Sequence, residues 1–236
     1  NGRQIKKINE NDGLPHNFII SLFQSKSGRV WIGTANGLGY IDGDKVGSID
    51  LTPYHSSQNV FGFSEDSDGT LWIATDRAVL RFRDGKIVAI GTKEGMPIAT
   101  VFQIVVDKYT NFWLTSNRGV FYIKRANLEA VADGKSKQVN AINFAEADGM
   151  ASAQCNGGAG PAAMRAKDGS IWVATAKGVS IIQPDNLARY QAPPPPVVIE
   201  TVMVDDQHVN VNEDITLSSS MRKIEMFYAS LSYRTP

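Results

Sequence analysis

The chain has 236 residues, 24 lysines and arginines balanced by 24 aspartates and glutamates, and a hydrophobic fraction of 42%. This is the composition of a globular protein with one or two apolar cores. The zero net charge excludes the basic faces that nucleic acid and anionic membranes select, so we expect no nucleic-acid partner and no membrane contact within this chain. The single cysteine, Cys155, cannot form an internal disulfide.

The first residues are Asn1, Gly2 and Arg3, without an initiator methionine or a charged and apolar leader. We interpret the chain as an internal or processed piece of a longer protein. Residues 4–8 have the character of a strand that ends a preceding structural unit.

Four tryptophans give the sequence its period. They stand at Trp31, Trp72, Trp113 and Trp172, separated by 41, 41 and 59 residues. Each lies in a similar segment, and the segments are 28–34, 69–75, 110–116 and 169–175. The register continues beyond the segments, because a small residue follows six positions after each tryptophan. The longer last interval indicates an insertion of about 18 residues in a structural repeat.

Each repeat divides into short β-rich runs separated by turn residues. In the first repeat, the runs 18–23, 30–33 and 38–41 are separated by Ser27-Gly28 and Asn36-Gly37. Four strands fit each repeat. The only helical pattern, 127–132 with Asn127 as its N-cap, falls in the lengthened stretch, where we expect it to decorate a blade.

A period near 41 residues with four strands per unit is typical of β-propeller blades. We therefore predict an all-β fold, with propeller repeats over residues 1–190. Since propellers usually have more than four blades, we expect part of a larger ring. The tryptophans are expected to pack between blades.

The sequence changes character at 191–196, a proline-rich linker that neither a helix nor a central strand tolerates. The remaining residues, 197–236, contain strand patterns but are too few for a closed sandwich. We expect them to form part of an immunoglobulin-like β-sandwich.

The sequence resembles the two-component regulator propeller family in residues 12–17, which lead into a strand, and in residues 28–38. Residues 148–158 and 182–184 are similar to the final blade of such propellers, and residues 195–236 to the start of the triple-tyrosine domain that follows them. The resemblance implies a periplasmic, non-catalytic sensor region of an inner-membrane receptor whose output is a histidine kinase or a diguanylate cyclase. Many relatives sense oligosaccharides.

Catalytic and metal-binding signatures are weak. The three histidines, His16, His55 and His208, form no metal-spaced pair and flank no nucleophile motif, and Cys155 has no histidine nearby in sequence. We therefore expect no catalytic residue, no metal and no cofactor.

Blade topology indicates where a ligand would bind. In an up-and-down blade, the segment leading into the first strand and the loop between the second and third strands lie at the same end. Fourteen residues before the tryptophans stand Asn17, Gln58, Ala99 and Gly158, and five after them stand Asn36, Arg77, Arg118 and Lys177. The predicted ligand-binding residues are His16, Asn17, Asn36, Gln58, Arg77, Arg118 and Lys177. Their amides and cations suit a polar, anionic small molecule such as an acidic oligosaccharide.

Two other function classes stay open. A scaffold propeller would bind another polypeptide, and a propeller glycosidase or lyase would need paired carboxylates, of which Asp76 is the only obvious one in these loops. A homodimer is expected in the receptor reading, and unpaired sheet edges also predict association.

Overall fold

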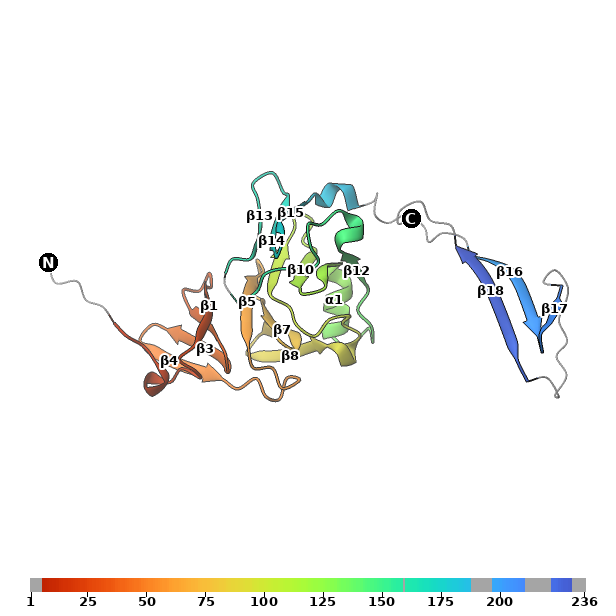
Figure 1. The fold of residues 1–236 in the computed structure, drawn as a ribbon. Helices are drawn as coiled ribbons and strands as arrows, with labels where there is room; N and C mark the ends of the chain where they lie inside the picture. Colours follow the sequence, from red (N-terminus) through yellow and green to blue (C-terminus); the bar gives the residue numbers. More distant parts are fainter. Residues whose placement is uncertain (1–5, 159, 188–196, 211–221, 231–236) are drawn as a thin grey trace. The chain divides into compact units, whose positions relative to one another are not determined.

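The structure is a computed structural model that describes residues 6–158, 160–187, 197–210 and 222–230 (Figure 1). The chain divides into two compact units, residues 1–184 and 185–236, which are described separately. The predicted linker 191–196 lies outside the described residues.

The first unit consists of small antiparallel sheets joined in sequence order, which confirms the propeller prediction. Blade 1 is β1 (Ile19–Gln24), β2 (Val30–Thr34), β3 (Gly37–Asp42) and β4 (Lys45–Ile49). Blade 2 is β5 (Val60–Glu65), β6 (Leu71–Thr75), β7 (Ala78–Arg83) and β8 (Lys86–Gly91). Blade 3 is β9 (Gln103–Val106), β10 (Phe112–Ser116), β11 (Gly119–Ile123) and β12 (Ala141–Phe144). Blade 4 is β13 (Ala163–Arg165), β14 (Ile171–Thr175) and β15 (Gly178–Ile182).

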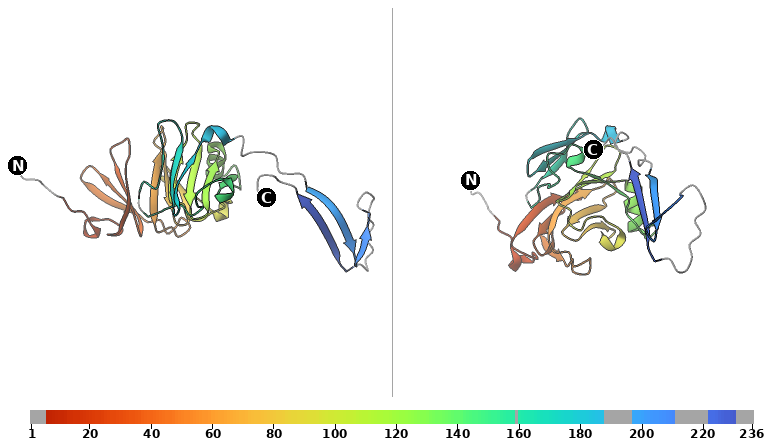
Figure 2. Two further views of the ribbon diagram at one scale, coloured as in Figure 1. Left: turned by 45° about the horizontal axis from the view of Figure 1, so that its top comes forward. Right: turned by 45° about the vertical axis from the view of Figure 1, so that its right-hand side comes forward.

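The first strands of successive blades contact one another, β1 with β5, β5 with β9 and β9 with β13. The sheets therefore stand side by side around their inner strands, as Figure 2 shows. Blade 4 departs from the prediction of four strands, because its described residues form three.

The cores lie between the blades, and the tryptophans are central to them. Trp31 packs edge-on against Phe82 of blade 2, with 5.2 Å between ring centroids, and Trp72 against Phe112 of blade 3 at 4.8 Å. Trp31, Trp72 and Trp113 are 3%, 0% and 1% exposed. Burying such large side chains between sheets supplies much of the apolar stabilisation of the unit.

Trp172 is an exception to the predicted burial, since it is 43% exposed. Its strand β14 lies in the last blade, and no following blade exists among the described residues to cover it. A repeat position alone does not bury a side chain, because the neighbouring sheet must be present.

Short 3₁₀ turns lead into three blades. They are η1 (Glu10–Asp12), η2 (Thr92–Glu94) and η3 (Glu146–Asp148), each followed by a glycine with positive φ: Gly13, Gly95 and Gly149. The next residue is buried in each case, and these residues are Leu14, Met96 and Met150. The turns thereby anchor the approach to each blade. A fourth turn, η4 (Pro184–Asn186), spans the boundary between the two units in the sequence.

The helix α1 (Arg125–Ala132) connects β11 and β12 and so decorates blade 3, as predicted. Its N-cap is Lys124, however, and not Asn127. The side chain of Asn127 instead bonds the chain beyond the helix, donating to the carbonyl of Gln138 and accepting from the amide of Asn140.

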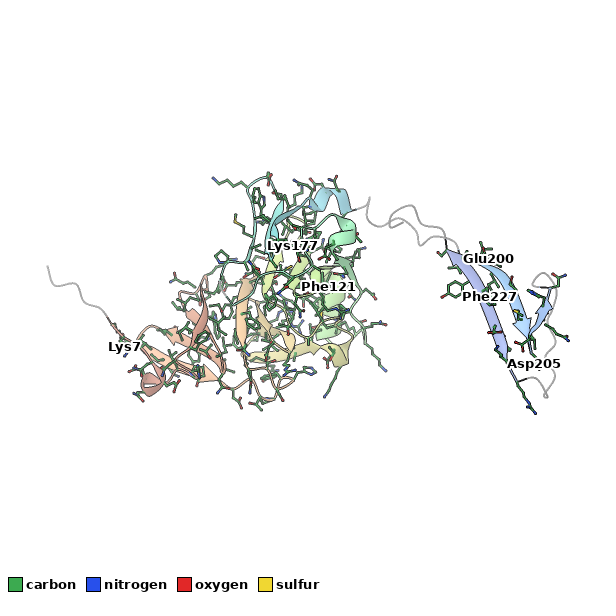
Figure 3. The ribbon with its side chains drawn as sticks, in the orientation of Figure 1. Lys7, Phe121, Lys177, Glu200, Asp205 and Phe227 are labelled. Atoms are coloured by element: carbon green, nitrogen blue, oxygen red, sulfur yellow. The ribbon has the colours of Figure 1, made fainter. Side chains whose placement is uncertain are left out.

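The second unit contains β16 (Val197–Val204), β17 (Gln207–Val209) and β18 (Ile224–Ser230), in the order β17-β16-β18. Positive φ angles at Asp205 and Asp206 make the turn between β16 and β17. Asp205 is labelled in Figure 3. The described residues of this unit form three antiparallel strands, and the expectation that they are part of an immunoglobulin-like β-sandwich stays a prediction.

Candidate functional site

A buried hydroxyl fixes the loop between the second and third strands of every blade. The hydroxyl belongs to the residue three positions after each tryptophan. It donates a hydrogen bond to the backbone carbonyl three residues further along the chain. It also accepts a hydrogen bond from the backbone amide of the residue five positions after the tryptophan. The hydroxyls belong to Thr34, Thr75, Ser116 and Thr175, and their donor distances are 2.8, 2.7, 3.0 and 2.8 Å. The amides belong to Asn36, Arg77, Arg118 and Lys177, at 3.1, 3.2, 3.0 and 3.3 Å. Because the backbone is held from inside, the side chains at these four positions project outward, and all four residues are exposed.

Backbone hydrogen bonds join these loops to the segments that lead into the first strands. The amides of Ala35 and Asp76 donate to the carbonyls of Phe18 and Asn59, at 3.1 and 3.2 Å. The amide of Gly37 donates across the blade boundary to the carbonyl of Gln58, at 2.8 Å. The predicted residues therefore lie at one end of their blades. We call the set His16, Asn17, Asn36, Gln58, Arg77, Arg118 and Lys177 the polar rim.

Three rim side chains are uncommitted within the described part of the chain. Asn36, Gln58 and Arg118 are exposed and form no side-chain hydrogen bond or ion pair there. Arg77 lies beside Asp76, with Nε 3.7 Å from Oδ2 and a side chain that is 60% exposed. The rim can therefore offer amides and guanidinium groups to a ligand without first breaking strong internal bonds.

Lys177 completes the cations of the rim and is labelled in Figure 3. It lies near Glu146, whose pKa is lowered chiefly by the hydrogen bond from the amide of Ala153 and further by the charge of Lys177. The carboxylate thus stays ionised beside the ammonium group. Lys177 carries its charge beside a carboxylate, as Arg77 does beside Asp76.

The two remaining rim residues shape the chain before β1. The Nδ1 atom of His16 accepts a hydrogen bond of 2.9 Å from the backbone amide of Phe18, so the neutral ring carries its proton on Nε2. The side chain of Asn17 accepts the amide of Glu10 at 3.0 Å, while Glu10 accepts the amide of Asn17 at 2.6 Å. Both side chains hold the backbone around them, which leaves Nε2 of His16 and the side-chain nitrogen Nδ2 of Asn17 for a ligand.

Asp76 also has a structural task. Its carboxylate accepts hydrogen bonds from the backbone amides of Gln58 and Asn59, at 3.0 and 3.3 Å. It also accepts one from the side-chain amide of Asn59, at 3.4 Å. It thereby joins the loop after β6 to the segment that leads into β5. The carboxylate of Asp76, the one acid that the glycosidase or lyase interpretation has in these loops, is thus engaged by three hydrogen-bond donors.

The segment that leads into blade 4 differs from the prediction, which placed Gly158 beside the loop between β14 and β15. Cys155 pairs with Thr175, and the amide of Ala176 donates to the carbonyl of Gln154 at 2.9 Å. The extra residues between Cys155 and β13 shift the count from Trp172. Cys155 is 3% exposed, and burial raises the pKa of its thiol, which makes it an unreactive structural cysteine.

Hollows lie elsewhere on the unit as well. One of about 540 Å³ runs along the inner strands β1, β5 and β9 and is lined mainly by apolar residues, with Ser21 and Gln103 as polar exceptions. Another, of about 600 Å³, lies at the end opposite to the rim, beside Lys108, Arg165 and Lys167. Among the described residues no three His, Cys, Asp or Glu side chains gather as a metal site would require. In the same residues no helix is long and apolar enough to span a membrane.

Comparison with known proteins gives one family match. Residues 13–36 and 55–77 match the two component regulator propeller family. The two stretches cover the approach and the first hairpin of blades 1 and 2. No curated protein matches the sequence.

Solved structures extend the likeness in fold. The extracellular domain of BT3049 from B. thetaiotaomicron, assigned to a hybrid two-component system, matches 96% of this chain with a TM-score of 0.71 and 21% identity. The extracellular domain of BT4673 from the same organism, also assigned to a hybrid two-component system, matches 89% with a TM-score of 0.53 and 17% identity. This chain covers 31% and 26% of those chains, so it spans about a third or less of their length.

Proposed function

We propose that this chain is the ligand-sensing, extracytoplasmic part of a membrane signal-transduction receptor. The chain itself is non-catalytic and couples ligand binding to a cytoplasmic kinase or cyclase. One observation carries the proposal: the stretches that match the regulator propeller family, 13–36 and 55–77, contain five of the seven rim residues. The segments similar to the family are thus the ones that form the candidate binding surface.

The ligand class follows from the charges of the rim. Arg77, Arg118 and Lys177 stand at equivalent positions of successive blades, and blade 1 has the amide of Asn36 there. Guanidinium groups bind carboxylates and sulfates through paired, charge-assisted hydrogen bonds. We propose an acidic oligosaccharide as the ligand, bound across neighbouring blades.

The order of the two units supports the coupling step. We propose that the second unit, with β16, β17 and β18, is the start of a triple-tyrosine domain in a periplasmic receptor that acts as a homodimer. In such a receptor, ligand binding at the propeller changes how the two protomers are arranged. The triple-tyrosine domain passes this change on toward the membrane.

Calorimetric titration with acidic and neutral oligosaccharides of equal length tests the function. We expect the acidic series to bind. Arg118→Ala should weaken binding by about tenfold, the loss of one charge-assisted hydrogen bond. The matched control is Arg165→Ala, an exposed arginine at the opposite end of blade 4, which should leave the affinity unchanged.

Each other result has a definite meaning. Equal weakening by both variants would indicate general charge attraction and not a rim site. Tight binding of neutral sugars alone would overturn the ligand class but keep the sensor. A folded protein that binds no sugar, but captures a purified polypeptide through the rim, would favour the scaffold function.

A further inference from the structure

A second group of cations lies at the end of the blades opposite to the rim. In three blades the turn between the first and second strands carries an exposed lysine five residues before the tryptophan, and these residues are Lys26, Lys108 and Lys167. Lys108 and Lys167 line the hollow of about 600 Å³ together with Arg165, the last residue of β13. All residues that line this hollow belong to blades 3 and 4, so it lies between two blades that the chain contains.

The boundary between blades 1 and 2 shows how such a lysine turn meets the next blade. The backbone amide of Lys26 donates to Oε2 of Glu65 at 2.8 Å, and its Nζ donates to the carbonyl of Asp66 at 3.1 Å. Glu65 is the last residue of β5. The inner strand of blade 2 thus presents a carboxylate to the lysine turn of blade 1, which compensates the positive charge.

The boundary between blades 3 and 4 has the opposite charge at the equivalent position. Arg165 corresponds to Glu65, because each stands seven residues before its tryptophan and pairs with the residue directly before that tryptophan. The lysine turn of blade 3 lies close by, since a Cβ on Gly169 of blade 4 would be 3.6 Å from Cδ of Lys108. Cations gathered in one place repel one another, and an anion bound between them removes this cost.

The neighbouring carboxylates leave this positive charge largely uncompensated. Asp107 is 2% exposed and is held by three donors of its own hairpin. Asp168 lines the hollow, and its carboxylate accepts the amide and the hydroxyl of Ser170, at 2.9 and 2.6 Å. In the part of the chain that the structure describes, Arg165 and Lys167 form no ion pair and no side-chain hydrogen bond. With three cations and one carboxylate, the lining of the hollow has a net charge of +2.

We propose that the hollow between blades 3 and 4 is a second ligand site, which binds a phosphate group, either as inorganic phosphate or as a monoester. A phosphate monoester carries a charge of about −1.5 to −2 at pH 7, which matches the net charge of the lining. The guanidinium group of Arg165 donates two parallel hydrogen bonds to the phosphate oxygens, and the ammonium groups of Lys108 and Lys167 add charge.

Tyr109 gives the site a surface for the organic part of a monoester. Its ring is 56% exposed, and Nζ of Lys108 lies 5.2 Å from the ring centroid. A sugar or base attached to a phosphate beside Lys108 can therefore stack on an aromatic face. This contact separates the two sources of the phosphate group, because inorganic phosphate has nothing to stack.

An NMR titration of the 236-residue chain with inorganic phosphate tests the site, with the ionic strength held constant by chloride. We expect saturable shifts of the backbone amides of residues 107–110 and 165–169. Arg165→Ala should weaken binding at least tenfold, and Arg165→Glu, which introduces the carboxylate that blade 2 has at this position, should abolish it. The matched control is Arg118→Ala, an exposed arginine of the rim, which should leave phosphate binding unchanged.

A second titration, with glucose 6-phosphate, identifies the source of the phosphate group. Tighter binding than that of inorganic phosphate, with the gain lost in Tyr109→Ser, would support the proposal with a monoester as the ligand. Equal binding of the two compounds would support it with inorganic phosphate as the ligand. Acetate that binds as tightly as phosphate would overturn the choice of a doubly charged group.

Three results of the first titration would overturn the site itself. They are shifts that grow linearly at all lysines, which indicate general charge screening, saturable shifts confined to the rim, and equal weakening by Arg165→Ala and Arg118→Ala. The proposed rim site is tested separately, because Arg165→Ala is expected to leave its oligosaccharide affinity unchanged. Failure of the phosphate site would therefore leave the sensor function standing, and failure of the rim would leave the phosphate site standing.

Discussion

Replacement of Asp66 should weaken the contact between blades 2 and 3. Its carboxylate accepts the indole N–H of Trp72 at 2.8 Å and both terminal guanidinium nitrogens of Arg125, at 2.6 and 2.8 Å. Arg125 begins α1 in blade 3 and lies over the ring of Phe112, 4.4 Å from its centroid. One side chain of the β5–β6 turn thus holds both the blade 2 tryptophan and its neighbour's helix.

The magnitude follows from what Asp66→Ala leaves behind. Trp72 is 0% exposed, so its N–H would lose its only partner without access to water, at about 1–3 kcal/mol. Loss of the pair with Arg125 adds about 1–2 kcal/mol, since Arg125 is 22% exposed and keeps its bond to the carbonyl of Thr110. We expect a total of about 2–5 kcal/mol. Asp66→Asn keeps an acceptor for the indole and should lose only about 1–2 kcal/mol.

Urea unfolding followed by tryptophan fluorescence measures this loss. All four tryptophans lie in residues 1–184, so the signal reports the first unit alone. A double-mutant cycle with Arg125→Ala should give a coupling energy of about 1–2 kcal/mol. A loss below 1 kcal/mol for Asp66→Ala, or strict additivity with Arg125→Ala, would refute the reasoning.

Three further changes test other parts of the fold. Leu38→Ala removes a fully buried side chain between blades 1 and 2 and should reduce the unfolding free energy by about 2–5 kcal/mol in urea, whereas a change under 1 kcal/mol would contradict the packing. Thr75→Val removes the hydroxyl that fixes the β6–β7 loop and should cost about 1–2 kcal/mol, with faster amide exchange confined to that loop; unchanged exchange would count against the role of the hydroxyl. Because the amide of Ala153 lowers the pKa of Glu146, the folded state favours the carboxylate, and this stabilisation is present above the ordinary value of 4.5 and lost as the pH falls. Stability measured between about pH 6 and pH 3 should therefore fall less in Glu146→Gln than in the wild type, and parallel curves would disprove the assignment.

The sequence predicted the blades well because local chemistry sets them. Tryptophan at a fixed strand position and a small residue at the turn produce the same hairpin wherever they recur, as at Trp31 with Gly37 and Trp113 with Gly119. The positive φ at these glycines, 114° and 108°, is a local requirement that the sequence displays directly.

The failures concern features that depend on distant parts of the chain. Trp172 has the same local sequence as its buried equivalents, but its exposure depends on whether another sheet faces it. Asn127 looks like a cap, yet its side chain bonds residues 11 and 13 positions away. Gly158 was placed by counting across a segment in which blade 4 has extra residues, and a count cannot detect a shift of register.

For the candidate site, the positions on the rim followed from topology, but the tasks of the side chains did not. Nothing in the sequence showed that His16 and Asn17 would bond the backbone around them. The hydroxyls that fix the loops were visible in each repeat, three residues after the tryptophan, and their recurrence was the signal that could have been used.

Because of these hydroxyls, the residues that maintain the loops of the fold are not the residues whose side chains would contact a ligand. Because the loop is held by the residue three after the tryptophan, the loop needs only the backbone amide of the residue five after it, and the side chain there can change. The four blades already carry asparagine, arginine, arginine and lysine there. Selection can therefore diversify this surface one blade at a time without loss of stability, and a library randomised at these four positions would sample new specificities on an unchanged framework.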